Sequence, residues 1–238
     1  MQPVKNSDSI KMAENQQDQD VIVTEAIDRT EHFINQNKKS LGIIVGALFL
    51  AVAGYLFYQK VYVANKEKAA QEVMFKAENY FYADSIAKAI NGDGNNPGFE
   101  EISSEYSVSK SGNLAKYYLG LSYMKNKEFD KAIETLKGYD AQDEMTGALA
   151  LGLIGDAYME TGKTEDAISY YEKAAKEKAN SFTTPIMMMK EAIAQESKSN
   201  YQAALELYNN IKKSYPTSNE GRSIDKYIAR AEAMVNNK

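Results

Sequence analysis

Hydrophobic and polar positions divide the chain into three parts. Residues 1–20 are mostly polar, residues 41–58 contain no charged side chain, and the remainder mixes polar and apolar residues. From residue 66 onward apolar residues recur every three to four positions, which is the spacing of one face of an α-helix. We therefore expect an all-α protein: one N-terminal transmembrane helix, then a solenoid of helical hairpins with capping helices.

The uncharged run, LGIIVGALFLAVAGYLFY from Leu41 to Tyr58, predicts a membrane span. As a helix it is about 27 Å long, close to the ~30 Å hydrocarbon core of a bilayer. Lys38 and Lys39 precede it and Lys60 follows it. Apolar residues on every side argue against a soluble core helix, and the long polar segment before it argues against a signal peptide. We assign residues 41–60 to a transmembrane helix.

Gly42 and Gly46 form a GxxxG pattern, which lets a second membrane helix approach closely. The alternative is that glycine is simply common in membrane helices. Charge does not decide the orientation of the span. Residues 26–40 and residues 59–73 each hold three Lys or Arg side chains, a tie under the positive-inside rule.

The tail before the span, residues 1–40, has two parts. Residues 1–20 are acidic and polar, and we expect them to lack regular structure. Residues 21–37 predict a short amphipathic helix, which either lies on the membrane surface or docks on a partner. Its apolar positions are Val23, Ala26, Ile27, Thr30, Phe33 and Ile34.

A repeated arrangement of small and large residues follows the span. Gly120 and Gly155 are 35 residues apart, as are Ala132 and Ala167. With Leu and Tyr at fixed offsets, these positions resemble the tetratricopeptide repeat (TPR), whose unit is a helical hairpin of about 34 residues. Small residues let the two helices approach, and large ones fill the gaps. We place repeats near residues 113–146, 148–181 and 185–218; the last has Glu191 and Gln195 where Leu and Tyr are expected.

Segments at both ends of the repeats predict caps, which a solenoid needs. Residues 66–90 predict one long amphipathic helix that continues from the membrane span. Residues 219–236 predict a C-terminal capping helix, and Thr217 and Glu220 suit a capping box at its start. The folded domain then spans residues 61–238.

Composition excludes several classes of chemistry. The net charge of −5 gives no electrostatic support for binding nucleic acid. The chain has no Cys, which excludes a disulfide framework, a thiolate zinc site and a catalytic thiol. Its one histidine, His32, lies in the tail, which excludes a His-based triad inside the folded domain. Asp93, Asn95 and Gly98 resemble the start of a calcium loop, but Ser104 stands where the bidentate Glu is required. We expect no enzyme activity, no cofactor and no metal.

The concave face of the repeats is the predicted protein-binding surface. In this fold the second, fifth, ninth and twelfth positions of each repeat point inward. Such an apolar, Met-rich surface adapts to irregular partners. The alternative is that the last helix or the curvature of the solenoid fills it. The predicted residues are Leu114, Tyr117, Leu121, Met124, Leu149, Met159, Ile186, Met189 and Ile193.

The whole layout resembles the YfgM-like proteins, which are bitopic inner-membrane proteins of Gram-negative bacteria. The resemblance rests on IDRTEHFINQNKKS, the Gly-rich span and the TPR-like domain; YFYADSIAKAINGDGNNPGFEEISSEYSVSKSGNLAKYYLGLSY is similar to the Bacteroidetes type. It implies a cytoplasmic N-terminus and a periplasmic domain. It also implies an ancillary subunit of the SecYEG translocon, working beside a PpiD-like chaperone/isomerase on emerging secreted chains.

Two other functions remain open from the residues. One is a cytosol-facing TPR receptor for precursors or chaperones, which the tied flanking charges permit. The other is an envelope-assembly scaffold that links the inner membrane to outer machinery.

Overall fold

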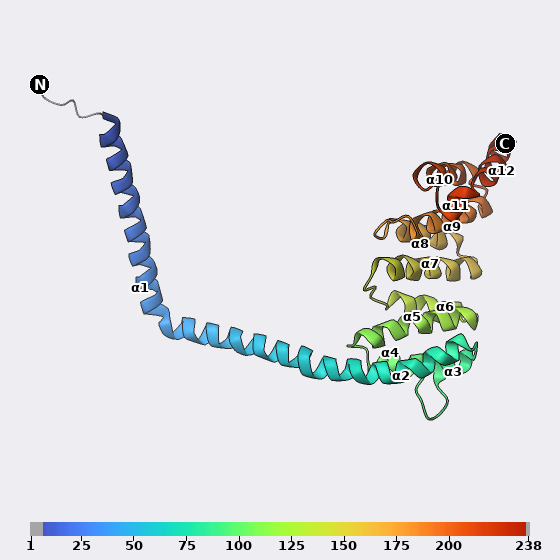
Figure 1. Ribbon diagram of the computed structural model, residues 1–238, viewed down its shortest axis with the longest axis horizontal. Coiled ribbons are helices and arrows are strands. Elements are labelled where there is room, and N and C mark those ends of the chain that lie inside the picture. Colours follow the sequence, from blue (N-terminus) through green and yellow to red (C-terminus); the bar gives the residue numbers. More distant parts are fainter. Residues whose placement is uncertain (1–6, 237–238) are drawn as a thin grey trace, which may run out of the picture. The chain divides into compact units, whose positions relative to one another are not determined.

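The computed structural model describes the backbone of residues 7–236 and the side chains of residues 29–236 other than Glu144. Every regular element in that range is helical, which confirms the expected all-α class. The chain divides into two units, Met1–Val61 and Tyr62–Lys238 (Figure 1).

The first unit is the helix α1, Ser7–Phe57. Its apolar run is exposed: Ile43, Phe49 and Leu50 each keep more than 70% of their surface accessible. Within Arg29–Tyr82 the helix is apolar enough to cross a membrane, and none of the apolar window is buried in the folded chain. The run is therefore not a core helix of the chain's own fold.

The expectation that residues 1–20 lack regular structure is wrong from Ser7 onward, where α1 begins. Residues 7–20 include three Gln and one each of Glu, Ala, Met and Lys, which are good helix formers. Residues 1–6 lie outside the described part. The predicted amphipathic face of residues 21–37 rests partly on Val23, Ala26 and Ile27, whose side chains also lie outside it.

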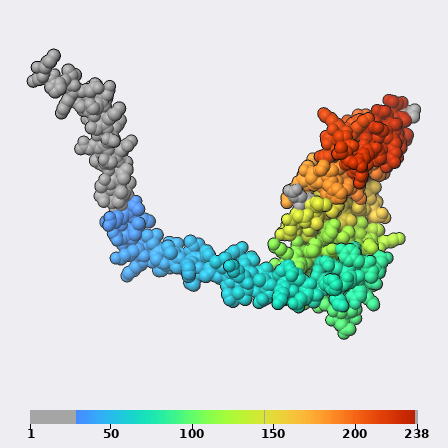
Figure 2. All heavy atoms as spheres, viewed as in Figure 1, coloured from blue at the N-terminus to red at the C-terminus, as the bar shows by residue number. Residues whose placement is uncertain are grey.

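Helical backbone continues beyond α1 without a non-helical residue. A π-helical stretch, η1 (Tyr58–Val63), leads into α2 (Ala64–Tyr82). In the second unit the helices pack as antiparallel neighbours in chain order, and Figure 2 shows their atoms filling one continuous body. After α2 the helices are α3 (Ile86–Asn91), α4 (Phe99–Glu105), α5 (Lys110–Lys125), α6 (Phe129–Lys137), α7 (Glu144–Glu160), α8 (Thr164–Lys176), α9 (Thr183–Ser197), α10 (Tyr201–Ser214), α11 (Asn219–Arg222) and α12 (Asp225–Asn236).

The three TPR-like hairpins are α5–α6, α7–α8 and α9–α10, and we call the first helix of each the A helix and the second the B helix. Side chains fix where the A helices begin. Ser109 accepts a hydrogen bond from the Gly112 amide at α5, and Asp143 accepts from the amides of Met145 and Thr146 at α7. Such caps satisfy the free N–H groups of a first turn.

Each hairpin turns through one residue in the left-handed conformation. Lys127, Gly162 and Ser199 have φ of 61°, 74° and 59°. In each turn the next residue donates its amide to the carbonyl five positions back, at 2.9 Å. This is the Schellman arrangement that ends a helix and reverses the chain.

The same turn occurs once more, before the first predicted repeat. Asp84 has φ of 55°, and the Ser85 amide donates to the Tyr80 carbonyl at 2.8 Å. The single helix expected over residues 66–90 is therefore wrong: it is a fourth hairpin, α2 followed by α3 and α4. Asp reverses the chain here because its short polar side chain tolerates the left-handed region.

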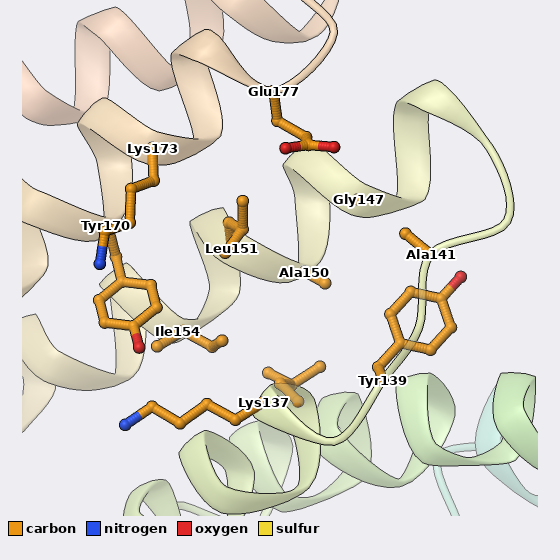
Figure 3. Close-up of a pocket in the computed structure, with 11 residues that line it drawn as sticks. Lys137, Tyr139, Ala141, Gly147, Ala150, Leu151, Ile154, Tyr170, Lys173 and Glu177 are labelled. Carbon is orange, nitrogen blue, oxygen red and sulfur yellow. The ribbon is translucent and has the colours of Figure 1, made fainter.

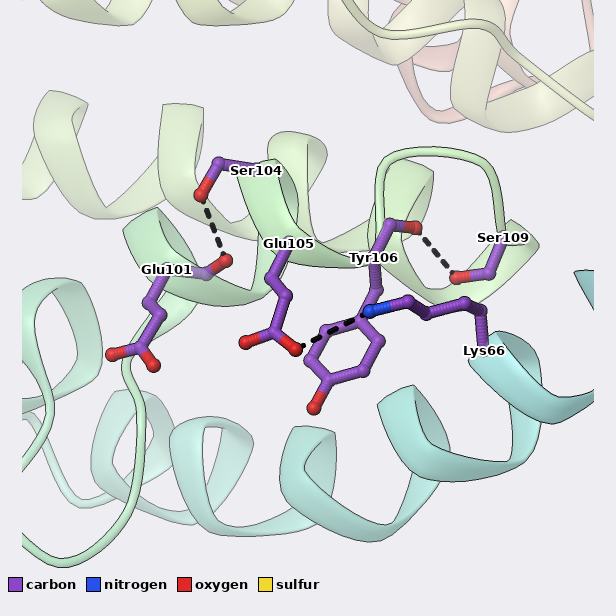
Figure 4. A network of polar contacts seen from close by, with 6 residues as sticks. All are labelled: Lys66, Glu101, Ser104, Glu105, Tyr106 and Ser109. Atoms are coloured by element: carbon purple, nitrogen blue, oxygen red, sulfur yellow. Dashed lines mark hydrogen bonds and ion pairs between the residues drawn. The ribbon is translucent and has the colours of Figure 1, made fainter. Parts of the chain in front are cut away.

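Polar contacts join α2 to the helices behind it (Figure 4). Lys66 Nζ lies 3.3 Å from Glu105 Oε1 and 5.0 Å from the centre of the Tyr106 ring. Glu67 accepts hydrogen bonds from the amide and the hydroxyl of Ser111 at 2.9 and 2.8 Å. These contacts attach the start of α2 to both α4 and α5.

The small residues of the repeat lie where the paired helices approach most closely, as expected. A Cβ added at Gly120 would lie 2.5 Å from Leu136, and one at Gly155 would lie 2.6 Å from the Tyr171 ring. The small residues of the B helices, Ala132, Ala167 and Ala204, are fully buried. Side chains larger than these would force the paired helices apart.

The C-terminal cap differs from the single helix expected over residues 219–236. Ser218, rather than Thr217, caps a short α11 by accepting from the Gly221 amide. A Cβ at Gly221 would meet the Tyr215 carbonyl oxygen, so the chain passes closely there before α12 begins. α12 then packs against α10, continuing the stack.

Candidate protein-binding surfaces

The nine residues of the predicted concave face all lie on the A helices α5, α7 and α9. Eight are half-buried and Ile193 is 44% exposed. Successive A helices contact one another, so the rows contributed by the three repeats are neighbours. The result is an accessible apolar surface that crosses three repeats.

Within this face the residues differ in how far they belong to the core. Seven pack against buried clusters; Leu121 and Ile193 are not among the residues described as packing there. Both occupy the ninth position of their repeats. They are therefore the positions where a substitution changes the surface with least damage to the fold. The packed residues are Leu114, Tyr117, Met124, Leu149, Met159, Ile186 and Met189.

The ninth position of the middle repeat is Asp156, which the apolar pattern missed. Lys190 Nζ lies 2.7 and 2.9 Å from its two carboxylate oxygens, and the Tyr171 hydroxyl donates to it at 2.7 Å. Burial, reinforced by this hydrogen bond, raises the pKa of Tyr171. The charge that interrupts the apolar row is thus paired within the protein. The repeat register alone places Asp156 at the ninth position, but it does not reveal the partner.

The last helix, α12, does not pack mainly against the A helices that carry the predicted concave face. α12 packs mainly against α10, and α11 packs against α9 and α10. α10 is a B helix, so the C-terminal cap extends the stack at its end.

On α1, Gly42 and Gly46 present open backbone. A Cβ built at either position would meet no atom within 4 Å. Substitution there leaves the described packing of this chain unchanged.

Two hollows lie between successive B helices. The first hollow, about 360 Å³, lies between α6 and α8 over α7 (Figure 3). Leu151 and Ile154 line its floor, and Tyr139, Tyr170 and Lys137 stand around it. Lys137 Nζ donates to the Tyr158 hydroxyl at 2.9 Å and lies 5.6 Å from the centre of the Tyr170 ring.

The second hollow, about 430 Å³, lies between α8 and α10 over α9. Its lining includes Met188 and Leu207 together with Glu191 and Glu172. Burial, with repulsion from Glu172, raises the pKa of Glu191 to about 7.

The segment that resembles a calcium loop is an internal turn. The Asp93 carboxylate accepts from the Tyr80 hydroxyl at 2.6 Å and from the amides of Asn95 and Asn96 at 2.9 and 2.7 Å. The Tyr80 hydroxyl and these amides hold the pKa of Asp93 well below its usual range. No group of three or more His, Cys, Asp or Glu side chains that could hold a metal occurs among the described residues.

Comparisons with known proteins match the same helical hairpins. Models of the tetratricopeptide repeat match residues 114–141, 148–181 and 187–218. No curated protein matches the chain. Among solved structures, it is similar to the nearly identical TPR-like repeats of a putative kinesin light chain from Podosopora anserina. The TM-score is 0.55 at 15% identity, over 72% of this chain and 89% of that one.

At 15% identity the similarity to the solved structure supports the fold alone, whereas the family models match the amino-acid sequence of the repeats. Both point to the hairpins α5–α6, α7–α8 and α9–α10. The TPR fold is a scaffold on which other proteins bind. The second unit of this chain therefore contains three tetratricopeptide repeats and has a TPR-like helical fold.

Proposed function

We propose that this chain is a membrane-anchored scaffold whose predicted concave face binds a partner polypeptide. The observation that carries the proposal is the apolar row of half-buried side chains crossing three A helices. An accessible apolar surface of this kind in a soluble domain marks a protein-binding site. The apolar run of α1 is the retained anchor, within residues 41–60.

The finer proposal is an ancillary subunit of the Sec translocon. It rests on the resemblance of the layout to the YfgM-like proteins. Residues 1–40 are then cytoplasmic and residues 61–238 periplasmic. The partners are SecYEG, a PpiD-like chaperone/isomerase and emerging secreted polypeptides.

The anchor is tested by comparing the chain purified from membranes with the sequence. A retained span gives an intact mass of 26.5 kDa and resists extraction by alkaline carbonate. A shorter chain that begins after the apolar run is the product of a cleaved signal sequence, and refutes the anchor. Protease protection of a tag at Lys238 then distinguishes a periplasmic domain from a cytosol-facing receptor.

The partner is tested by gentle solubilisation, crosslinking and pulldown on the C-terminal tag. We expect SecY, SecE, SecG or a PpiD-like protein in stoichiometric amounts. Outer-membrane or cell-wall factors in their place move the function to envelope assembly.

The binding surface is tested by a double substitution, Leu121→Lys with Ile193→Lys. Both residues lie on the predicted concave face outside the described cores, so helical circular dichroism should persist while partner recovery falls. The matched control is Met234→Lys on α12, where an exposed apolar side chain receives the same charge. Equal recovery from all three chains refutes the assignment of this face.

The span is tested by Gly46→Leu. Because a side chain at Gly46 meets no atom of this chain, lost co-purification reports an intramembrane partner. Unchanged co-purification removes the GxxxG contact from the proposal.

A further inference from the structure

The two hollows occupy equivalent places in successive repeats. Ile154 precedes Gly155 and Glu191 precedes Ala192, the small residues that align the two A helices. The same register pairs the other lining positions of the two hollows. These pairs are Gly147 with Thr184, Leu151 with Met188, Tyr170 with Leu207, and Lys173 with Asn210.

The two hollows differ most in the side chain at the position of Ile154 and Glu191. In the first hollow the floor residue is Ile154, which is 2% exposed. In the second hollow a carboxyl group, Glu191, stands at that position. The rest of the lining keeps apolar surface, from Met188 beside Glu191 on α9, from Leu207 and from the ring of Tyr215.

Glu191 has no hydrogen bond or ion pair with another residue in the described range. Two charged groups share its hollow, Glu172 and Lys176, both from α8. Lys176 Nζ lies 2.5 Å from Glu172 Oε1, so the one nearby cation is already paired. The polar lining groups on the opposite wall are the amide of Asn210 on α10 and the phenol of Tyr215, which directly follows α10. A carboxyl group held this way lacks the compensation that buried charges normally have.

We propose that the second hollow is a binding site for a lysine side chain of a partner polypeptide, with the ammonium group directed at Glu191. A lysine carries a straight apolar stem that ends in a compact charge. The stem fits the apolar surface of Met188 and Leu207, and the charge meets the unpaired carboxylate of Glu191. The cavity, about 430 Å³, has room for the side chain and the adjoining backbone.

Protonation is coupled to this binding. Burial and the neighbouring Glu172 raise the pKa of Glu191 to about 7, so part of the population is uncharged at neutral pH. An ammonium group stabilises the ionised form, so binding releases a proton and tightens as the pH rises from 6 to 8.

This site is separate from the predicted concave face. It lies between the B helices α8 and α10 and uses Met188 and Glu191 of α9, whereas the predicted concave face uses other side chains of the A helices. Loss of one therefore leaves the other intact, and neither proposal depends on the other.

The experiment is a titration of the full chain in detergent micelles, labelled with ¹³C at the methionine methyl groups. The Met188 signal is identified by its loss in Met188→Leu. The probe is Nα-acetyl-lysine amide, and the matched probe without the charge is Nα-acetyl-norleucine amide. We expect the lysine derivative to shift the Met188 signal with about fivefold higher affinity, and to gain affinity from pH 6 to 8.

Glu191→Gln should bring the two probes to equal affinity, while Glu206→Gln on the exposed side of α10 should leave the preference unchanged. Equal affinities of the two probes for the unsubstituted chain overturn the proposal, whatever the variants do. A preference that survives Glu191→Gln overturns the role of this carboxylate.

Discussion

Glu191 makes the stability of the third repeat depend on pH. Its pKa rises from an ordinary 4.5 to about 7 in the folded chain, because burial and Glu172 disfavour the ionised form while Lys176 partly offsets them. Folding therefore favours the protonated carboxyl group. Its contribution to stability is fully present below pH 4.5, declines as the pH rises toward 7, and is lost above about pH 8.

The size of the effect follows from the two pKa values. The difference between 4.5 and about 7 corresponds to about 3 kcal/mol of unfolding free energy. Glu191 keeps some contact with water, and solvent screening lowers this to about 1–2 kcal/mol.

Glu191→Gln removes the titration while keeping the shape of the side chain. Urea unfolding of the full chain in mild detergent, followed by circular dichroism at pH 5 and pH 8.5, measures the difference between the two proteins. We expect the unsubstituted chain to lose about 1–2 kcal/mol relative to the variant between the two pH values. Glu206→Gln, an exposed glutamate on α10, should show no such change. A wild-type-minus-variant difference that is the same at both pH values would falsify the reasoning.

Three further pairs of substitutions test the packing, each by urea unfolding. Gly155→Ala should cost about 1–2 kcal/mol, since the new methyl group meets the Tyr171 ring, whereas Gly138→Ala, with its nearest contact at 3.4 Å, should be neutral. A neutral Gly155→Ala contradicts the close approach of α7 and α8. Lys127→Gly should gain about 0.5–1 kcal/mol by relieving a left-handed residue, and Gly162→Ala should lose a similar amount in the equivalent turn; two changes of the same sign contradict this. Asp156→Ala should cost about 1–3 kcal/mol, and a double-mutant cycle with Lys190→Ala should show a favourable coupling energy. A coupling near zero means that the ion pair contributes nothing.

The hairpins of the repeats were predictable because their packing leaves a mark on the sequence. Gly120 and Gly155 lie where any side chain would meet Leu136 or Tyr171. Such positions accept only small residues, so they recur at the repeat spacing. The membrane-length helix was predictable for a similar reason, since a bilayer fixes both length and polarity.

The fourth hairpin was missed because it lies outside the recognised repeat register and its turn contains no glycine or proline. Asp84, Lys127 and Ser199 all adopt positive φ although none of them is glycine. The surrounding contacts, such as the Ser85 amide on the Tyr80 carbonyl, impose that conformation. Local propensity therefore favoured one helix through Asp84, and tertiary structure overrode it.

Prediction of the candidate sites from the sequence was incomplete for a different reason. The repeat register placed all nine residues of the predicted concave face on A helices, but an apolar criterion passed over Asp156, whose charge is paired with Lys190 across α7 and α9. A pairing between repeats leaves no periodic signal. The hollows between B helices were also beyond the sequence, because each is made by side chains from three helices.

The departure of the third repeat from its pattern gains meaning only from the structure. In sequence, Glu191 is a mismatch at a position that is Leu119 and Ile154 in the preceding repeats. In the fold it is the floor of a hollow, where an ionised side chain costs stability and an apolar one would not. Residues that break the packing rules without a structural return are expected at functional sites. If Glu191→Leu stabilises the chain at pH 8.5 and also removes its preference for the lysine derivative, cost and binding belong to the same carboxylate. If Glu191→Leu stabilises the chain and the preference for the lysine derivative remains, Glu191 lowers stability without contributing to binding in this hollow.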